Sequence, residues 1–400
     1  MSSSPLRILV TCDWFSPDTG GGAERVAAEV AKRLAEKGHR VTVLATRPRG
    51  QGNFTLPPGM DFVAVPAYSL SRVLHAQVSV APRLAWSTGN VIAALRPDVV
   101  WGHSLQFQTT MAAAAWARRH GVPFVVTAHI GDLNAVDGPL GLAARIHEAT
   151  IGRLILRSAT RAIAVSEPVA AHLRSLARQL PIDVIPNGVD LARFRPGVGV
   201  RGDLLRVGFM GRLVPNKGPD VILRAIAEAV RLGVDLELSI AGAGPEEKNL
   251  RHLASDLGVE HRVRFEGHRP DPEAWLRDID VLVRPSLTEG MPLGLLEAMA
   301  VGVPVIASDI PGNAWLIRAT DAGLLIPVGD HEALARALAS LWREPRLLDE
   351  MRAAGIRAAT SFTWDRTSAL TEATLLRAVD GVRRAPSLPL SDPVDGTPAV

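Results

Sequence analysis

Short apolar runs alternate with amphipathic stretches along almost the whole chain. Stretches with a helical spacing of apolar residues, such as Ala23–Lys37 before Gly38, separate these runs. Strands that alternate with helices build parallel sheets from βαβ units. The first half therefore predicts an α/β domain. Its expected strands are Leu6–Cys12, Arg40–Thr46, Phe62–Val65, Asp98–Trp101, Phe124–Ala128, Ala162–Val165 and Asp183–Ile185.

The pattern changes near residue 187 and then restarts. Residues 187–203 are rich in glycine and proline and indicate a connector. The strands expected after it are Leu205–Met210, Leu236–Ala241, Val263–Glu266, Val281–Arg284, Val303–Ala307 and Leu324–Ile326, and the helices are Pro219–Leu232, Glu246–Leu257, Leu293–Ala300 and Glu332–Trp342.

Two Rossmann-like α/β domains in tandem are the resulting prediction. We expect the N-terminal domain over 1–186, a linker over 187–203, the C-terminal domain over 204–363, a last helix over 364–384 and a disordered tail over 385–400. Ligands of parallel sheets bind outside the carboxyl ends of the strands. Two such domains facing each other across a cleft can divide a two-part substrate between them.

Composition narrows the class of protein. The 400 residues are 47% hydrophobic, which is enough for two cores, and the net charge of +3 does not indicate nucleic acid as a partner. The single cysteine, Cys12, excludes an intrachain disulfide and fits a reducing compartment. The N-terminus does not resemble a signal peptide, and no apolar run reaches the roughly 18 residues of a membrane span. We therefore expect a soluble, cytoplasmic protein.

Lysine is rare in this chain, and one lysine stands beside an arginine after an expected strand. Four lysines, Lys32, Lys37, Lys217 and Lys248, occur among 44 basic residues. Arg212 and Lys217 follow the strand Leu205–Met210, with Gly211 at the turn and Gly218 at the start of the next helix. Two cations beside free helix amides suit a diphosphate. Two surface cations in a loop are the alternative.

Two glutamates follow the fourth expected strand of the second half. Glu289 lies on the loop after that strand, and Glu297 lies in the helix that comes next. A carboxylate accepts hydrogen bonds from hydroxyl groups, so the first suits a sugar and the second a ribose. Gly290 and the amides near Met291 and Leu293 can donate to phosphate or sugar oxygens. A solvated glutamate with a helix-capping one is the alternative, and paired acids also occur in glycosidases.

A glycine-rich loop, Gly20-Gly21-Gly22, follows the first expected strand and opens a helix. Glycine lets the backbone approach a phosphate or sugar closely. The loop is not the dinucleotide-binding fingerprint G-x-G-x-x-G, because Arg25 stands where the third glycine belongs. A tight strand-to-helix turn is the alternative.

Two histidines also stand at carboxyl ends of expected strands. His129 ends the strand Phe124–Ala128 and can hydrogen-bond a sugar hydroxyl, and His103 holds a comparable place after Trp101. A histidine with a purely local hydrogen bond is the alternative for each.

The triplet Asp278-Ile279-Asp280 is of a kind that holds a metal in one class of glycosyltransferase. A strand-entry turn is the better interpretation here, because Asp280 directly precedes an apolar strand. Arg212 and Lys217 can supply the charge neutralisation that a metal would supply, so we expect no required metal. No cysteine or histidine cluster has zinc spacing either.

The stretch Arg145–Arg161 carries arginines at helical spacing beside apolar residues. An amphipathic helix with a solvated arginine stripe explains it, and a patch that touches anionic lipid is the alternative. The second interpretation would place the protein at the inner face of the membrane.

Together these motifs resemble the family 4 retaining glycosyltransferases of the GT-B fold. The resemblance extends to about residue 380. The matching motifs are Gly21-Gly22 before Ala-Glu, Pro186–Asp190, Gly211-Arg212 with Lys217-Gly218, Pro285-Ser286 with Glu289-Gly290 and Glu297, and Gly323–Pro327 with Gly329-Asp330. One segment departs from the family, which often has Gly-Gly-x-x-Glu where this chain has Pro311–Trp315.

The resemblance implies roles for these residues. Arg212 and Lys217 would bind the diphosphate of a UDP- or GDP-sugar, Glu289 its sugar hydroxyls and Glu297 its ribose. Gly21 and Gly22 would lie against the diphosphate, His129 near the reacting carbon and His268 near the base. It also implies a same-face substitution without a required metal, in the synthesis of a cell-envelope glycan, glycolipid or small-molecule glycoside.

Two other classes of protein compete with this interpretation. A Rossmann-type oxidoreductase is disfavoured because the third glycine is absent at positions 25 and 247. A non-catalytic protein that binds sugar nucleotides is disfavoured by the presence of Arg212, Lys217, Glu289 and Glu297 together.

Overall fold

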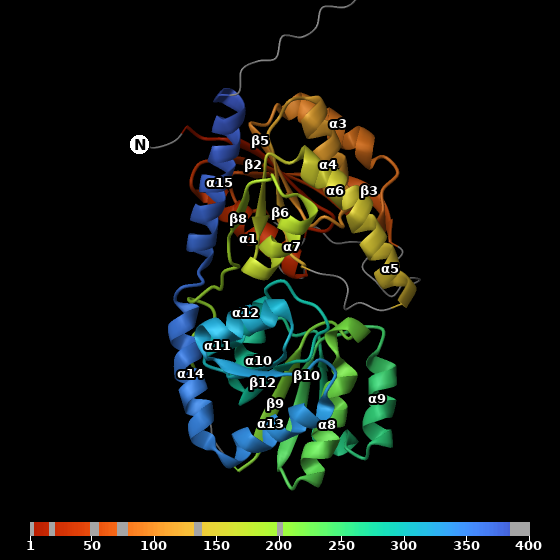
Figure 1. The fold of residues 1–400 in the computed structure, drawn as a ribbon, viewed down its shortest axis with the longest axis vertical. Helices are drawn as coiled ribbons and strands as arrows, with labels where there is room; N and C mark the ends of the chain where they lie inside the picture. Colours follow the sequence, from red (N-terminus) through yellow and green to blue (C-terminus); the bar gives the residue numbers. More distant parts are fainter. Residues whose placement is uncertain are drawn as a thin grey trace, which may run out of the picture.

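Two lobes lie one above the other along the long axis of the molecule, and each is built on one sheet (Figure 1). The computed structural model describes residues 4–15, 21–48, 56–69, 79–131, 138–197 and 203–384. The predicted tail at 385–400 and residues 198–202 of the predicted linker lie outside the described residues.

The first sheet has eight strands in the order β4-β3-β2-β1-β5-β6-β7-β8. All pair in parallel except the two-residue β4, which is antiparallel to β3. The strands are β1 (Arg7–Cys12), β2 (Arg40–Pro48), β3 (Met60–Ser69), β4 (Ser79–Val80), β5 (Val99–His103), β6 (Phe124–Ala128), β7 (Arg161–Ala164) and β8 (Ile182–Val184).

Helices cover both faces of this sheet, which is why its strands read as continuous apolar runs. Successive residues of a strand point to opposite faces. Ile8 and Val10 of β1 pack with α1 and α15, whereas Leu9 packs in the cluster that holds α3, α4 and α6. The helices are α1 (Gly22–Glu36), α3 (Leu84–Leu95), α4 (Gln108–Arg119), α5 (Gly138–His147), a π-helical turn (Glu148–Gly152), α6 (Arg153–Ser158) and α7 (Glu167–Leu176).

The second sheet has six parallel strands in the order β11-β10-β9-β12-β13-β14. Its strands are β9 (Leu205–Met210), β10 (Leu236–Ala241), β11 (Val263–Gly267), β12 (Val281–Arg284), β13 (Val305–Ser308) and β14 (Gly323–Ile326). Its helices are α8 (Pro219–Arg231), α9 (Glu247–Asp256), α10 (Pro272–Arg277), α11 (Leu293–Val301), α12 (Pro311–Thr320), α13 (His331–Arg343) and α14 (Pro345–Ala359).

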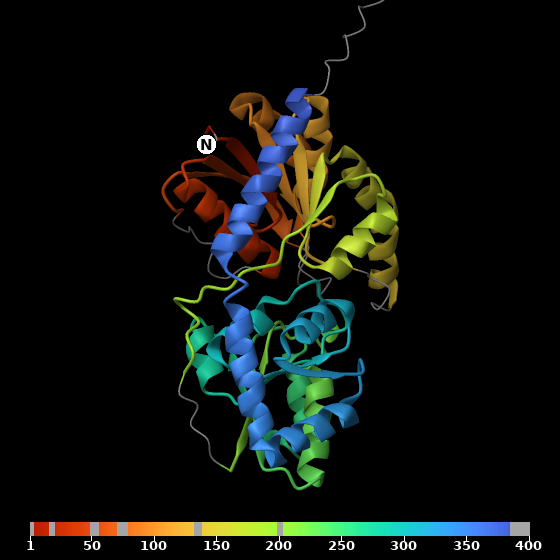
Figure 2. The same ribbon diagram turned by 60° about the vertical axis from the view of Figure 1, so that its left-hand side comes forward.

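The last helix, α15 (Trp364–Arg384), returns to the first sheet, as Figure 2 shows. Leu375, Ala378 and Val379 of α15 are buried in the same core cluster as α1. Nζ of Lys37 also lies 2.6 Å from a carboxylate oxygen of Glu372. The sequence pattern predicts this helix but does not say which sheet it covers.

The chain therefore crosses between the lobes twice, and the two crossings touch. The amide of Val189 donates to the carbonyl of Phe362 at 2.8 Å. A Cβ at Gly188 would lie 2.4 Å from the amide nitrogen of Trp364, so only glycine fits there. Within the described part of the chain, none of the helices combines the length and the apolar character needed to cross a membrane.

Candidate functional site

Each sheet reverses its strand order at one place, and the carboxyl ends at these two places face each other. The reversal lies between β1 and β5 in the first sheet and between β9 and β12 in the second. Ligands of open parallel sheets bind at such switch points. The hydroxyl of Ser166, just after β7, donates to the carbonyl of Gly290 after β12 at 2.8 Å. A Cβ at Gly290 would lie 2.1 Å from the carbonyl oxygen of His129, so this glycine lets the lobes meet.

The carboxylate of Glu289 is the centre of an ion cluster on the second lobe. Its Oε1 accepts from Nζ of Lys217 at 2.7 Å and from Oγ of Ser286 at 2.9 Å. Arg284, the last residue of β12, adds Nε at 2.9 Å and Nη2 at 2.8 Å. Nη1 of Arg284 also donates to the carbonyl of Met210 at the end of β9. The four contacts to Glu289 all use Oε1, and among the described residues no hydrogen bond or ion pair involves Oε2.

Opposing effects act on the pKa values of this cluster. Burial raises the pKa of Glu289, but the charges of Arg284 and Lys217 outweigh it and lower that pKa to about 2. Burial lowers the pKa of Lys217 further than the Glu289 carboxylate raises it, and the Arg284 charge lowers it as well. Glu289 is therefore ionised at neutral pH. Sequence reasoning missed Arg284, although a charged residue at the end of a buried strand was a usable signal.

The two predicted cations lie near each other. Lys217 ends a one-turn 3-10 helix (Pro215–Lys217), and Gly218 follows with a φ of 65°. A Cβ at Gly218 would lie 2.3 Å from the carbonyl oxygen of Pro285, so glycine brings this turn against the Glu289 loop. Arg212 is exposed; its charge adds to the lowering of the pKa of Lys217 that burial causes, and it opposes the rise in the pKa of Glu24 that burial causes. The charge of Arg212 thus acts on residues of both lobes.

Glu297, predicted to hold a ribose, is buried and bound by a cation from the other lobe. Nη2 of Arg25, in the first turn of α1, lies 2.5 Å from Oε1 of Glu297 in α11. Burial lowers the pKa of Arg25, but the Glu297 carboxylate, together with the charges of Glu29 and Glu273, raises it by more. In the sequence, Arg25 was noted only because it stands where a dinucleotide-binding loop has its third glycine. Its ion pair with Glu297 was not predicted, because a contact between residues 272 positions apart leaves no local pattern.

The first lobe contributes two buried carboxylates beside the predicted glycine loop. Gly21 directly precedes α1, and a Cβ there would lie 2.7 Å from Oε2 of Glu24. Burial raises the pKa of Glu24, and the charge of Asp13 raises it further. The Asp13 carboxylate accepts from the amide and hydroxyl of Thr109, both at 2.8 Å, at the start of α4. Gly22 is the first residue of α1, and a Cβ added there would meet no atom within 4 Å.

The two histidines flagged in the sequence lie side by side. His103 ends β5 and is fully buried, and His129 follows β6 and is half-buried. Nδ1 of His103 lies 3.0 Å from Nε2 of His129. Burial lowers the pKa of both imidazoles, to about 3 for His129, so both are neutral at physiological pH.

Of the other residues predicted to bind the donor, Met291 and Leu293 are buried in packing contacts, and His268 lies on the surface. The carbonyl and Sδ of Met291 accept from the side chain and the amide of Asn187 at 2.9 and 3.2 Å. The side chain of Leu293 packs with the core of the first lobe. His268 is exposed after the edge strand β11, and in the described ranges no hydrogen bond or ion pair joins it to the other site residues.

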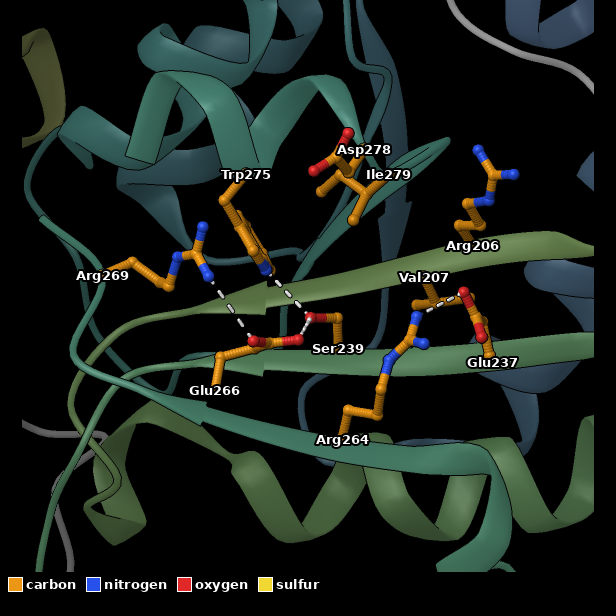
Figure 3. Close-up of a pocket in the computed structure, with 10 residues that line it drawn as sticks. All are labelled: Arg206, Val207, Glu237, Ser239, Arg264, Glu266, Arg269, Trp275, Asp278 and Ile279. Atoms are coloured by element: carbon orange, nitrogen blue, oxygen red, sulfur yellow. Dashed lines mark hydrogen bonds and ion pairs between the residues drawn. The ribbon is translucent and has the colours of Figure 1, made fainter. Parts of the chain in front are cut away.

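The Asp278–Asp280 triplet and its neighbours contact the strands of the second sheet. Oδ2 of Asp280 accepts from the amide of Arg206 at 2.8 Å, as a strand-entry turn predicts. Asp278 lines a pocket of about 110 Å³ on the face of β9, β10 and β11 (Figure 3). Charges there pair with each other, as Arg264 does with Glu237 at 2.6 Å. The pocket lies along the strands and not at their carboxyl ends. The described residues contain no group of three His, Cys, Asp or Glu side chains arranged to hold a metal.

The two opposed sheets form the GT-B fold. The fold matches that of sucrose-phosphate synthase from Thermosynechococcus elongatus with a TM-score of 0.80 and 21% identity, covering 94% of this chain and 99% of that one. It also matches Anabaena HepE in complex with UDP and glucose with a TM-score of 0.72 and 20% identity, covering 93% and 99%.

Sequence comparison gives the family. The model for Glycosyltransferase Family 4 matches residues 20–193, and the model for Glycosyl transferases group 1 matches residues 192–359. The D-inositol 3-phosphate glycosyltransferase of Frankia alni is 31% identical over 88% of this chain and 94% of its own length. A namesake from Catenulispora acidiphila is 30% identical over 96% and 99%. The chain belongs to the glycosyltransferases of family 4 and is an enzyme of that class.

Stability of the Glu289 cluster will depend on pH. The folded state lowers the pKa of Glu289 from 4.5 to about 2, so its stabilisation is complete above pH 4.5 and is lost as the pH falls toward 2. We expect the stability advantage of the wild type over Glu289→Gln, on the order of 3 kcal/mol at neutral pH, to shrink on acidification. Urea unfolding between neutral pH and about pH 3.5 measures it, with exposed Glu350→Gln as control. A pH-independent difference would contradict the assigned cause.

The ion pair between Arg25 and Glu297 will show strong energetic coupling. Arg25→Met or Glu297→Gln alone leaves a buried polar or charged partner, whereas the double variant removes both. We expect a coupling energy of about 1–3 kcal/mol in a double-mutant cycle measured by urea unfolding. The exposed pair of Lys32 and Glu36 on the same helix, 3.9 Å apart, is the control and should give only a few tenths of a kcal/mol. Additive effects at Arg25 and Glu297 would exclude a stabilising interaction.

Proposed function

We propose that this enzyme transfers a sugar, with retention, from a UDP- or GDP-sugar to a hydroxyl group of its acceptor. The observation that carries the proposal is the Glu289 carboxylate, fixed by Lys217 and Arg284 at the carboxyl edge of the second sheet. The charge of Arg212 acts on Lys217 of the same cluster, and α8 begins at Pro219, shortly after Lys217. Such a site offers both a carboxylate for hydroxyl groups and cations for phosphates.

The leaving group carries the developing negative charge of the reaction. Arg212, Lys217 and the positive end of the α8 dipole would stabilise the departing diphosphate more than the bound donor, which lowers the barrier. Gly21 and Gly22 would approach the diphosphate from the first lobe. Because these groups supply the neutralising charge, the proposed reaction requires no metal.

The sugar and ribose would be held by acceptor and donor groups at the same edge. Oε2 of Glu289 accepts from sugar hydroxyls, and the backbone of Gly290, Met291 and Leu293 donates to sugar or phosphate oxygens. Glu297 accepts from the ribose, which requires Arg25 to share that carboxylate or release it. His129 binds a sugar hydroxyl near the reacting carbon, and His268 contacts the base.

Retention follows from substitution on one face of the sugar. The acceptor oxygen bonds to the anomeric carbon on the side from which the phosphate oxygen departs. The acceptor proton passes to an oxygen of the leaving phosphate, so no enzymic nucleophile takes part. Exclusion of water between the lobes would limit hydrolysis of the donor.

The acceptor of the proposed reaction supplies a hydroxyl group. The relatives from Frankia alni and Catenulispora acidiphila are named for D-inositol 3-phosphate. We include a polyol phosphate among the acceptor classes, with cell-envelope glycans, glycolipids and small-molecule glycosides. The same reaction chemistry serves each of them, because each offers a hydroxyl group.

A lipid-linked acceptor gains support from the surface of α5 and α6. Leu142, Ile146 and Leu154 are 53%, 56% and 58% exposed, and Arg153 and Arg157 are exposed beside them. Exposed apolar side chains next to arginines suit the surface of an anionic bilayer. We propose that this face contacts the inner leaflet of the membrane peripherally.

Replacement of the cluster residues will separate catalysis from folding. We expect Lys217→Ala and Glu289→Ala each to reduce sugar transfer at least about a hundredfold. Lys248→Ala and Glu350→Ala, which change the same residue types on the surface, should retain activity. The assay measures release of UDP or GDP from a panel of nucleotide sugars with the acceptor classes above. Binding of UDP or GDP without release from any nucleotide sugar would indicate a non-catalytic binding protein, and full activity of either cluster variant would refute the site.

Charged substitutions on α5 will test the membrane contact. We expect the double variant Leu142→Glu and Ile146→Glu to lose most binding to vesicles that contain phosphatidylglycerol, because a carboxylate resists entry into the interface. Sedimentation with vesicles, with and without the anionic lipid, measures binding. Leu232→Glu, at the end of α8 in the other lobe, is the matched control. Equal sedimentation of the three proteins would exclude this face as the contact.

A further inference from the structure

The contact between His103 and His129 bears on which ring nitrogens carry a proton. His103 ends β5 and His129 directly follows the neighbouring parallel strand β6, with His103 paired in register with Thr127. Their rings are stacked, with centroids 5.2 Å apart and 15° between the planes. Nδ1 of His103 lies 3.0 Å from Nε2 of His129, so one nitrogen donates a proton and the other accepts it.

The surrounding chain fixes the position of His103. Its ring centroid lies 4.3 Å from that of Trp101, and its carbonyl accepts from the hydroxyl of Thr110 at 2.6 Å. Ser104, the next residue, has a φ of 61°, a conformation disfavoured for residues other than glycine. The amide of Ser104 donates to the carbonyl of Thr127 at 2.8 Å, which holds this turn. Local backbone strain of this kind often supports a functional position.

The environment of His103 determines which nitrogen carries its proton. Both imidazoles are neutral, so each has one N–H. Nε2 of His103 is buried and has no hydrogen-bond partner among the residues that the structure describes. A proton on that nitrogen would be a buried donor without an acceptor, which native proteins rarely contain. If the proton is on Nδ1 of His103, Nδ1–H donates to His129 in the observed contact. Only the lone pair of Nε2 of His103 then lacks a partner.

We infer that His103 is a positioning residue that holds His129 in the tautomer protonated at Nδ1. Nδ1–H of His103 donates to Nε2 of His129, which must then accept. The proton of His129 is on Nδ1, for which no described residue provides an acceptor. This nitrogen is the donor available to a ligand.

The role of this tautomer in sugar binding rests on the proposed function. A His129 that donates from Nδ1 binds the oxygen of a sugar hydroxyl and cannot accept a proton through that nitrogen. His129 is thereby excluded as the base that deprotonates the acceptor. That role falls to the leaving phosphate, as the same-face substitution requires.

Nuclear magnetic resonance of the protein labelled with ¹⁵N at its 11 histidines tests the tautomer directly. Long-range proton–nitrogen correlations distinguish a protonated from an unprotonated ring nitrogen, and His129→Asn assigns the signals. We expect Nδ1 of His129 to be protonated in the wild type. In His103→Phe the fixed donor is lost, and we expect the Nε2–H tautomer to appear. His103→Asn offers its side-chain amide where Nδ1 was and should preserve the Nδ1–H tautomer.

Turnover of the nucleotide sugar provides the functional readout. We expect His103→Phe to lower it about tenfold, the effect of one hydrogen bond in the transition state, and His103→Asn to restore most of it. Circular dichroism checks that both variants fold. A wild-type His129 protonated at Nε2 would overturn the inference whether or not the variants fold. Unchanged tautomer or unchanged turnover in a folded His103→Phe would overturn it as well.

The two proposals fail in different ways. A wild type that turns over no nucleotide sugar would count against the proposed function. The tautomer of His129 in the wild type and in His103→Phe would still support or overturn the structural role of His103.

Discussion

One carboxylate oxygen organises the carboxyl edge of the second sheet. Oε1 of Glu289 receives Lys217 from a 3-10 turn, Arg284 from a strand end and Ser286 from the intervening loop. Without that negative charge, two largely buried cations would repel each other in a medium of low dielectric constant. With it, three separate segments converge on one point. The balance is clear from the pKa of Glu289, which burial raises and the two cations nonetheless lower to about 2.

The second organising interaction joins the lobes. Glu297 belongs to the second lobe by sequence, but Arg25 of the first lobe binds it at 2.5 Å. A ribose that uses the same carboxylate would compete with this ion pair. Nucleotide binding and the contact between the lobes would therefore be linked through one side chain. The carbonyl of Gly290, bound by Ser166, keeps the two edges together in a way that does not involve charge.

The sequence predicted the regular parts of the structure well. Leu205–Met210, Leu236–Ala241 and Val281–Arg284 are strands with the predicted bounds, because a strand buried on both faces is an unbroken apolar run. Lys217 and Glu289 were predicted in two separate clusters of one nucleotide-sugar site. They form an ion pair at 2.7 Å, since they follow adjacent strands β9 and β12. Their roles toward a donor stay predictions, as does the role of His268.

The site residues that the sequence did not predict were missed for one physical reason. Arg25 and Asp13 each stand near the end of a regular element, where periodicity no longer carries information. Their partners lie on other elements, 272 residues away for Arg25 and 96 for Asp13. Long-range pairing depends on how the sheets are arranged, and no local spacing records it. The same limit explains why the helix at 364–384 was predicted without its place on the first sheet.

That placement of α15 affects how the chain can fold during synthesis. The last helix covers one side of α1 and the part of the first sheet formed by β5, β6 and β7, so these surfaces remain open to water until the residues of α15 have left the ribosome. A fragment that ends near residue 186 would expose this surface permanently and would tend to aggregate. The N-terminal lobe therefore completes its core after the C-terminal lobe has been made, although its own strands are translated first.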